Sequence, residues 1–359
     1  MIISKNRIMK VWYYLKKCRF NVFINAINLI FFSSSYNKNF KKLKQNFTPL
    51  IFPTFEMSAH KYPCSVSIVI PVYNQWNFTY MCLKSILENT KDYCRSKDYN
   101  EIGDINCSYE IIIADDKSSD ETVNIEKYVK NVKIIRNKNN LGFIKNCNNA
   151  AEHASGKYIL FLNNDTKVQK DWLNNLLLLI EKDKSIGMVG PKFIYPNGVL
   201  LEAGGIIWQE GDSWQFGRLD NPNRPEYNYI KEADYISGAC IMIRKELFKD
   251  IGGFDERYAP AYYEDADLAF EVRKRGYKVV YQPKSLVIHY ENVTYGKKKA
   301  ISKNRNNIRF NDDAKNENNN VNVCNKEKFK QKWDYELKTL HYKHMTNIAI
   351  IKNRNKYYL

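Results

Sequence analysis

The sequence predicts an α/β fold built on a mostly parallel, doubly wound sheet. Between residues 64 and 164, short apolar runs alternate with segments whose apolar residues recur at helical spacing. Two of these runs end at acidic or amide residues, namely Asp115-Asp116 and Asn163-Asn164-Asp165. Ligands of such sheets bind outside the carboxyl ends of the strands, so these residues mark a candidate site. The alternative is that they only form Asx turns that end their strands.

The expected elements alternate between strand and helix. Four buried strands are expected, at Val66–Asn74, Tyr109–Ala114, Val132–Ile135 and Tyr158–Leu162. Four helices follow them, at Phe78–Asn89, Glu121–Val129, Ile144–Ala154 and Lys170–Lys182. Asp120 or Ser119 is expected to cap the second helix, and Ser155-Gly156 to end the third. This alternation predicts parallel strands with helices on both faces.

The second half of the chain is less regular. Residues 195–232 hold glycines, prolines and tryptophans but few aliphatic residues, which is typical of a long functional loop. Trp208 and Trp214 in this segment either stack on sugar rings beside a polar cleft or fill the core. The further expected elements are a strand at Ala233–Ile243, a helix at Arg244–Ile251, an acid-led helix from Glu264, and two strand pieces over Tyr277–Val287 around Pro283. Residues 297–325 are expected to form a Lys- and Asn-rich loop or insert, and residues 326–345 a basic helix.

Positive charge is concentrated at the two ends of the chain. Of the net charge of +17, residues 1–62 carry 11 Lys or Arg against one Glu, and residues 297–359 carry 16 against 6 acidic residues. Residues 63–296, the expected globular domain, hold 29 basic and 32 acidic residues. An enzyme that binds nucleic acid lines its groove with positive charge, so this balance argues against such a partner. The 8 cysteines form no C-x-x-C pair, which favours ordinary thiols in a reducing compartment.

Residues 1–62 are interpreted as a basic arm followed by a linker. Lys, Arg and aromatic residues mix over the first 20 positions, and an apolar run follows from Val22 to Phe32. The run is shorter than the about 20 apolar residues that a transmembrane helix needs. Its polar positions recur at helical spacing, so we expect an amphipathic helix that lies on an anionic membrane surface or packs on the protein's own body. A signal peptide is a third alternative, but no small-x-small cleavage site follows.

Acidic groups gather at the expected carboxyl edge of the sheet. They are Asp115, Asp116, Asp165, Glu264 and Asp265, with His289 at the end of a late strand. The acids of the last helix also suit its dipole, and a lone His at a strand end is commonly only structural. A cation ligand, an acidic strand end and a separate carboxylate fit transfer from a diphosphate-activated donor. In that reaction a metal neutralises the leaving group and one base takes the acceptor's proton.

Six motifs in chain order resemble those of family-two glycosyltransferases. They are VSIVIPVYN (Val66–Asn74), IIIADDKSSDET (Ile111–Thr122), RNKNNLGF (Arg136–Phe143), LNNDT (Leu162–Thr166), SGACIMIRKELFKDIGGFDE (Ser237–Glu256) and YEDADLAFEVRKRG (Tyr263–Gly276). The match spans about residues 64–296 and is greatest to bacterial enzymes of O-antigen, capsule and rhamnose-containing glycan assembly. These share a segment like Ala203–Arg218. The resemblance implies the GT-A (nucleotide-diphospho-sugar transferase) fold with an acceptor-side extension.

The resemblance also implies roles for single residues. The nucleotide sugar would be bound by Pro71, Tyr73, Asn74, Asp115, Asp116, Asn140, Asn164, Asp165 and Gly238. Pro71 and Tyr73 would line the nucleoside pocket, and Asp116 would contact the base. Asn163-Asn164-Asp165 stands where the family has its D-x-D motif and keeps only the last carboxylate, so Asp165 and His289 would bind Mn²⁺ or Mg²⁺. Asp265 matches the catalytic base, with Glu264 as the fallback.

Together these features predict an inverting glycosyltransferase. It would move a sugar from a UDP- or dTDP-type donor to a growing, lipid-linked surface glycan. It would work in the cytoplasm, peripherally on the inner face of the plasma membrane. One rival is a nucleotidyltransferase, which should carry a Gly-rich basic loop after the first strand, where Pro71-Val72-Tyr73-Asn74 stands. The other is a catalytically inactive glycan-binding or scaffold module, which Asn163 and Asn164 keep open.

Overall fold

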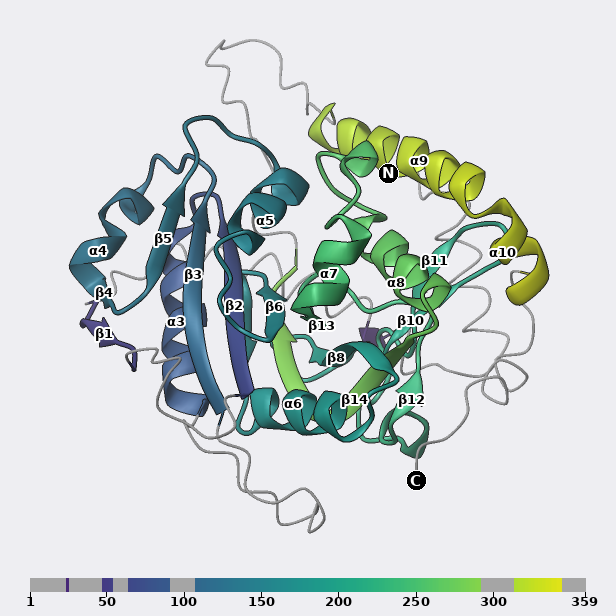
Figure 1. Cartoon of the computed structure of the whole chain (residues 1–359), viewed down its shortest axis with the longest axis horizontal. Coiled ribbons are helices and arrows are strands. Elements are labelled where there is room, and N and C mark those ends of the chain that lie inside the picture. Colours follow the sequence, from purple (N-terminus) through teal and green to yellow (C-terminus); the bar gives the residue numbers. More distant parts are fainter. Residues whose placement is uncertain (1–23, 26–46, 54–63, 91–106, 292–312, 344–359) are drawn as a thin grey trace.

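A computed structural model describes residues 24–25, 47–53, 64–90, 107–291 and 313–343 of the chain. A ten-stranded mixed sheet runs through this part, in the order β12-β14-β8-β13-β6-β2-β3-β5 along its main path. Figure 1 shows helices on both sides of the sheet. The expected N-terminal helix and linker lie outside the described residues, apart from the short pieces at 24–25 and 47–53.

The first half of the sheet is parallel, as the sequence predicts. β2 (Cys64–Val72) pairs in parallel with β3 (Cys107–Asp115) and with β6 (Tyr158–Leu162), and β3 pairs in parallel with β5 (Lys133–Arg136). The register places Val72 beside Asp115, and Asp115 beside Arg136. The residues that follow these strands are therefore gathered at one edge.

The second half of the sheet is mixed, because one central strand runs antiparallel to both of its neighbours. The expected strand at Ala233–Ile243 is only β13 (Cys240–Arg244), which runs antiparallel between β6 and β8 (Ile186–Ile194). Because Cys240 lies opposite Leu162, the segment that enters β13 arrives at the edge where β6 ends. The two expected pieces around Pro283 are one strand, β14 (Lys278–His289), whose register to β8 shifts between Gln282 and Leu286.

The remaining strands are short. β7 (Thr166–Val168) pairs with the end of β14, β9 (Leu200–Glu202) with β8, and β12 (Lys231–Glu232) with β14. β10 (Gly205–Ile207) and β11 (Ser213–Gln215) form a separate antiparallel pair. The segment 195–232, expected to be irregular, thus contains four short strands and the 3₁₀ turn Pro225–Tyr227.

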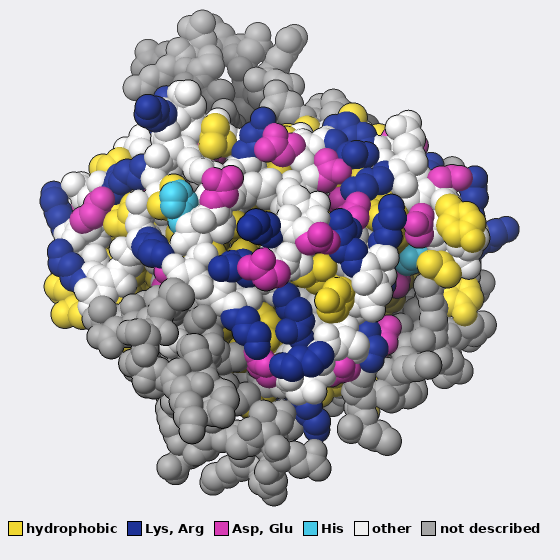
Figure 2. All heavy atoms as spheres, in the orientation of Figure 1, with side chains coloured by type: hydrophobic (Ala, Val, Ile, Leu, Met, Phe, Trp, Pro, Cys, Tyr) yellow, Lys and Arg dark blue, Asp and Glu magenta, His cyan; other side chains and the backbone are white. Residues whose placement is uncertain are grey.

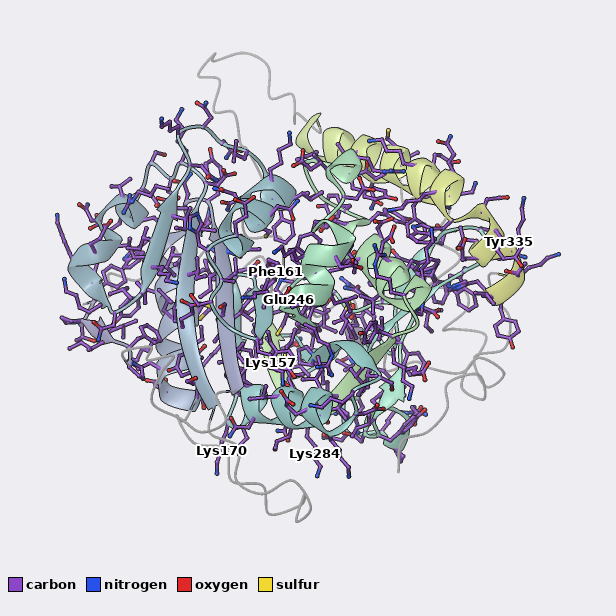
Figure 3. All side chains as sticks on the ribbon, in the orientation of Figure 1. Lys157, Phe161, Lys170, Glu246, Lys284 and Tyr335 are labelled. Atoms are coloured by element: carbon purple, nitrogen blue, oxygen red, sulfur yellow. The ribbon has the colours of Figure 1, made fainter. Side chains whose placement is uncertain are left out.

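Alternate residues of the central strands face two separate cores. Ile68 and Ile70 of β2 belong to the core under α3 (Trp76–Asn89) and α6 (Trp172–Lys182), whereas Val69 belongs to the other core. That second core is covered by α5 (Phe143–Ala151), α7 (Lys245–Ile251) and α8 (Glu264–Lys274). Phe161 of β6, labelled in Figure 3, lies behind α7 in that view. Its ring packs against Phe248 of α7, with ring centroids 5.1 Å apart. The doubly wound arrangement is therefore confirmed.

Two expected helix boundaries are wrong. Instead of a helix over Glu121–Val129, the chain forms a 3₁₀ turn at Glu121–Asn124, the short α4 (Ile125–Tyr128) and then β4 (Val129–Lys130). β4 pairs with β1 (Leu50–Ile51). Val129, the last residue of the expected helix, is therefore part of a strand that pairs with a distant segment. Asp120 does cap this region, because its side chain accepts a hydrogen bond from Thr122 N at 3.0 Å.

The expected cap at Ser155-Gly156 is also wrong. α5 ends earlier, at Ala151, with Glu152 at its C-cap. The amides of Ser155 and Gly156 instead donate to the side chains of Glu110 (2.7 Å) and Ser67 (2.9 Å). The pair thus fastens the entry to β6 onto β3 and β2.

The C-terminal segment contains more helix than the sequence predicts. α9 (Asp313–Lys332) occupies part of the region expected to be a loop, and α10 (Asp334–Leu340) follows it. Phe329, Trp333 and Leu337 are buried in the core that α8 covers. These apolar residues explain why this part of the basic extension packs on the sheet domain. Tyr335, on the outer side of α10, points away from the body (Figure 3).

Basic and acidic side chains are interspersed over the face seen in Figure 2. Within the described residues, no helix has both the length and the apolar character that crossing a membrane requires.

Candidate functional site

The end of β2 carries the first group of expected site residues. Pro71 is buried, and the side chain of Tyr73 is 42% exposed. Asn74 has a φ of 57°, and its Oδ1 accepts hydrogen bonds from the amides of Ser119 (2.7 Å) and Asp120 (3.2 Å). Its own amide donates to Ser118 Oγ at 2.8 Å. Asn74 therefore fixes the loop after β3, and Tyr73 remains the more accessible side chain.

The carboxylates at the end of β3 are buried and engaged by loops. Asp115 accepts a hydrogen bond from Ser118 N at 2.9 Å and lies 3.4 Å from the Arg136 guanidinium. Asp116 accepts from the amides of Leu141 (2.7 Å) and Gly142 (2.9 Å). Asn137 and Asn140 add side-chain hydrogen bonds to Asp116, the first to its carboxylate at 3.0 Å and the second to its carbonyl at 3.3 Å. Both acids thus shape the loops at this edge, and a contact of Asp116 with a base stays a prediction.

Asp165 and His289 are brought together, as expected, although 123 residues separate them in the sequence. β7 pairs with β14 so that His289 lies opposite Thr166, and the amide of Tyr290 donates to the Asp165 carbonyl at 3.0 Å. As a result His289 Nε2 lies 3.2 Å from Asp165 Oδ1. Burial lowers the pKa of His289, but the charge and hydrogen bond of Asp165, together with the charge of Glu291, outweigh burial and raise the pKa above its ordinary value.

The side chain of Asn164, next to Asp165 in the sequence, contacts α3 and not His289. Asn164 is buried, and its Nδ2 donates to Thr79 Oγ1 of α3 at 2.9 Å. The structure therefore gives Asn164 a role in fixing the turn after β6, while its expected contact with the donor stays a prediction. In the described part of the chain, no three His, Cys, Asp or Glu side chains are grouped as metal ligands. A cation at Asp165 and His289 would need further ligands from the donor.

The two acids that begin α8 occupy different environments. Asp265 is half-buried, and its two oxygens accept hydrogen bonds from the amides of Gly238 (2.9 Å) and Ala266 (2.8 Å). Glu264 is buried, and among the described residues its Oε2 has no hydrogen-bond partner. Burial, reinforced by the charge of Asp265, raises the pKa of Glu264 to about 8. Burial also raises the pKa of Asp265, but the two amides oppose that shift. The two backbone amides thus favour the charged form of Asp265, whereas burial without a partner for Oε2 favours the neutral form of Glu264.

Three charged residues of the site were not assigned a role from the sequence. The guanidinium of Arg218 makes two hydrogen bonds to Glu291, at 3.0 and 2.8 Å, and Tyr195 donates to the same carboxylate at 3.1 Å. Burial opposes ionisation of Glu291, but Arg218 outweighs it and lowers the pKa of Glu291 to about 2. Glu202 is fully buried, and its Oε1 accepts from Ser237 N at 3.2 Å. Burial raises the pKa of Glu202 to about 8. Glu202 and Arg218 lie in or next to the family-like segment Ala203–Arg218, which was the available signal.

The tryptophans of the irregular segment belong to the core. Trp208 and Trp214 are buried, and their rings meet edge to face with centroids 5.4 Å apart. The alternative that they stack on a sugar beside an open cleft is therefore wrong, and the core interpretation is confirmed.

The comparisons with known proteins point to one family. The model of the family "Glycosyl transferase family 2" matches residues 67–252. Among curated proteins, an uncharacterized protein of Sinorhizobium fredii is 26% identical over 64% of this chain. The O-antigen biosynthesis protein RfbC of Myxococcus xanthus is 32% identical over 40% of this chain. The aligned region makes up 25% of the first relative and 12% of the second.

Two further similarities were found, one to a curated protein and one to a solved structure. An N-acetylglucosaminyl-diphospho-decaprenol L-rhamnosyltransferase of Mycobacterium tuberculosis is 27% identical, over 53% of this chain and 69% of the relative. Among solved structures, GalNAc-T7 with UDP, GalNAc and Mn²⁺ aligns with a TM-score of 0.48 and 19% identity, over 63% of this chain and 43% of the other. The family match, together with the fold, confirms the expected GT-A class.

Proposed function

The chain belongs to glycosyl transferase family 2, and from this membership we propose that it is an inverting enzyme that moves a sugar from a nucleoside diphosphate to a growing cell-surface glycan. Sugar transfer follows from the family, whereas the inverting course and the acceptor are our proposal. The observation that carries it is Asp265, a half-buried carboxylate that accepts hydrogen bonds from two backbone amides. One of these amides, that of Gly238, lies in the segment that leads into β13 at the sheet edge where β6 ends. Two relatives, an O-antigen biosynthesis protein and an N-acetylglucosaminyl-diphospho-decaprenol L-rhamnosyltransferase, favour a lipid-linked acceptor.

The ends of β2 and β3 would hold the nucleoside of a UDP- or dTDP-type donor. Tyr73 offers an exposed ring for stacking, and Pro71 forms the buried floor beside it. Asn74, Asp115, Asp116 and Asn140 hold the loops 117–120 and 137–142 in place. The sugar would lie near Gly238, where an added Cβ would first meet Asp265 at 3.7 Å. Because Gly238 has no side chain, it leaves room for the sugar beside the carboxylate of Asp265.

A divalent cation, Mn²⁺ or Mg²⁺, fits the pair of Asp165 and His289. Mg²⁺ usually takes one or two carboxylates from the protein and completes its shell with phosphate oxygens and water. Asp165 would supply a carboxylate oxygen, His289 would supply a ring nitrogen, and the diphosphate would supply further oxygen ligands. When bound, the cation would neutralise charge on the departing diphosphate.

Asp265 would act as the general base. Its carboxylate takes the proton of the acceptor hydroxyl while that oxygen forms a bond to the anomeric carbon. The bond from the anomeric carbon to the diphosphate breaks in the same step, and the nucleoside diphosphate leaves with the electron pair. One displacement of this kind inverts the anomeric centre. A proton on Glu264, whose pKa burial raises to about 8, avoids two like charges side by side and so favours a charged Asp265.

The test begins with binding. A thermal-shift panel of UDP, dTDP and GDP, each with and without Mn²⁺ or Mg²⁺, should show stabilisation by at least one nucleotide that depends on the metal. Asp165→Asn should abolish the metal dependence, whereas Asp171→Asn, an exposed Asp at the start of α6, should not. No stabilisation by any nucleotide would contradict the proposal.

Turnover then separates an enzyme from a scaffold. The second candidate, a catalytically inactive glycan-binding module, is favoured by Asn163, which stands where the family has its first D-x-D acid. Release of nucleoside diphosphate from a panel of UDP and dTDP sugars, lost in Asp265→Asn, would exclude this module. Nucleotide binding without any release would support it.

Attachment to the membrane is a separate part of the proposal. The basic N-terminal arm would hold the enzyme on the inner face of the plasma membrane, close to a lipid-linked acceptor. Full-length protein should sediment with vesicles that contain anionic lipid, and a variant without residues 1–35 should not. Equal sedimentation of the two proteins would refute this part and leave the assignment of the site intact.

A further inference from the structure

The segment that leads into the acid pair has an unfavourable backbone. Tyr262 and Tyr263, which directly precede Glu264, have φ angles of 79° and 74°. Bulky residues rarely adopt this left-handed conformation, which persists only where surrounding contacts enforce it. Tyr263 is also the N-cap of α8 and makes no side-chain capping bond. Contacts from outside α8 must therefore hold this segment.

Asn325 of α9 supplies those contacts. Its side chain is almost completely buried, with 1% of the residue exposed. Its Nδ2 donates to the carbonyl oxygens of Tyr258, Ala261 and Tyr262, at 2.7, 3.0 and 3.1 Å. The two N–H groups of this one side-chain amide are thus shared among three carbonyl oxygens of the segment 258–262. Lys328, one turn further along α9, donates to the Arg257 carbonyl at 2.6 Å.

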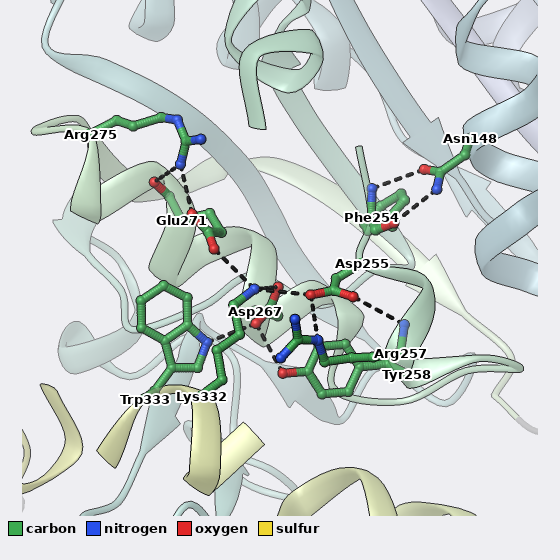
Figure 4. Close-up of polar contacts among 10 residues, drawn as sticks. All are labelled: Asn148, Phe254, Asp255, Arg257, Tyr258, Asp267, Glu271, Arg275, Lys332 and Trp333. Carbon is green, nitrogen blue, oxygen red and sulfur yellow. Dashed lines mark hydrogen bonds and ion pairs between the residues drawn. The ribbon is translucent and has the colours of Figure 1, made fainter. Parts of the chain in front are cut away.

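Lys332 and Trp333 hold α8 itself. The ammonium of Lys332 lies 2.8 Å from Asp267, 3.1 Å from Asp255 and 2.9 Å from Glu271 (Figure 4). The indole of Trp333 donates to Asp267 Oδ1 at 2.7 Å. Asp267 lies two residues after Asp265 in the first turn of α8, so the position of that turn depends on the contact with α9.

The contacts of α9 fall on one side of the site only. The hydrogen bonds and ion pairs of its described side chains reach Asp212 and residues 255–271. Among the described residues, none of them reaches the ends of β2 and β3 or the turn at Asp165. Loss of these contacts should therefore displace the acid pair and leave the nucleotide half in place.

We propose that Asn325 and Lys332 are positioning residues that set the place of the base Asp265 through the loop 258–263 and the first turn of α8. The inference rests on the proposed function, because it names what holds that base. It gives the C-terminal helix a role in turnover in addition to its packing. The predicted signature is a loss of kcat with unchanged nucleotide binding.

The test compares the same substitution at two places on α9. Asn325→Asp replaces the buried donor with a carboxylate that faces three carbonyls, whereas Asn322→Asp makes the same change at an exposed position one turn earlier. We expect Asn325→Asp to lower kcat for release of nucleoside diphosphate from a nucleotide sugar by about tenfold or more, since small misplacements of catalytic groups have such effects. Its affinity for the nucleoside diphosphate should stay within about twofold of the unchanged protein. Asn322→Asp should behave as the unchanged protein does.

Lys332→Met provides a second variant that keeps the aliphatic stem if Asn325→Asp does not fold. Hydrogen exchange of the amides 256–266, measured without substrate, reports whether α9 holds the loop. We expect faster exchange there in either variant and unchanged exchange at residues 111–120. Unchanged exchange, unchanged kcat in a folded variant, or equal losses of kcat and nucleotide affinity would each overturn the inference. The wild-type protein could also fail to bind or cleave any donor while hydrogen exchange at 256–266 still rises in the variants. That result would contradict the proposed function but would support the contact of α9 with the loop.

Discussion

Glu202 provides a quantitative test of the charges assigned to the site. Its side chain is fully buried, its Oε1 accepts from Ser237 N, and its Oε2 has no hydrogen-bond partner among the described residues. Burial raises the pKa of Glu202 from 4.5 to about 8. The Ser237 amide and the charge of Arg218 oppose the shift, and the charges of Asp265 and Glu291 add to it. We predict that Glu202→Gln stabilises the protein at neutral pH.

The magnitude follows from the difference in proton binding. Between pH 4.5 and about 8 the folded protein keeps a proton on Glu202 that the unfolded chain has lost. The free energy of unfolding therefore falls with rising pH by about 1.4 kcal/mol per pH unit from this group alone. At pH 7 the accumulated loss is about 3 kcal/mol relative to pH 4.5. Gln does not ionise in either state, so the variant lacks this loss.

The assay is urea unfolding of both proteins from pH 5.5 to 7.5. The difference in unfolding free energy, variant minus unchanged protein, should grow by about 1.4 kcal/mol for each pH unit. Glu110→Gln is the matched control: Glu110 is also buried, but Lys133, at 2.7 Å, and hydrogen bonds from Ser67 and Ser155 outweigh burial and lower its pKa. Glu110→Gln should destabilise the protein by about 1–3 kcal/mol, by an amount that stays constant over this pH range. A pH-independent difference for Glu202→Gln would show that Glu202 is ionised in the folded protein.

Three further predictions concern the acid pair at the start of α8, the packing of α9, and Gly205 of β10. Asp265→Asn should lower kcat for release of nucleoside diphosphate by about 10²–10⁴-fold, whereas Glu264→Gln should have little effect because Glu264 is neutral. Steady-state assays of the two variants check this. A larger loss of kcat in Glu264→Gln would make Glu264 the base instead of Asp265. Phe329→Ala should lower the free energy of unfolding by about 3–5 kcal/mol, because this buried ring packs on Tyr263 and Phe270. Unfolding in denaturant measures the change, and a small change would mean that α9 does not pack on the sheet domain. Gly205→Ala should lower the melting temperature, because its Cβ would lie 2.0 Å from the ring of Tyr235; an unchanged melting temperature would contradict that contact.

The parallel half of the fold was predictable because its strands are buried on both faces. Such strands read as uninterrupted apolar runs, and β2, β3 and β6 each end within two residues of the expected position. The direction of β13 was not predictable, because antiparallel pairing with β6 and β8 depends on partners far away in the chain. The early end of α5 and the strand β4 have the same cause, since distant partners such as Glu110 and β1 compete with local preference.

The proximity of Asp165 and His289 was predictable because a family-like motif marks Asp165, while the roles of the site residues stay predictions. Asp165, His289 and Asp265 lie at element ends with family-like flanks, and the structure brings the first two within 3.2 Å. Arg218 and Glu202 lie in or next to the family-like segment Ala203–Arg218, but that segment gave neither residue a role, and Glu291 lies outside the matching motifs. Charged residues in an irregular segment have no periodicity that distinguishes a buried position from an exposed one. Only the tertiary structure shows that Arg218 and Glu291 neutralise each other inside the site.

The ionisation states explain how so many acids coexist around one site that would bind an anionic donor. Asp265 affects the pKa of both Glu202 and Glu264, and Glu291 affects that of Glu202, so the four carboxylates interact electrostatically. If all four were charged, they would repel one another and the diphosphate. Instead Glu202 and Glu264 each hold a proton at pH 7, and Arg218 cancels the charge of Glu291. Asp265 is the one of the four whose charged form is favoured by two backbone amides and paired with no cation among the described residues, which suits the general base that we propose.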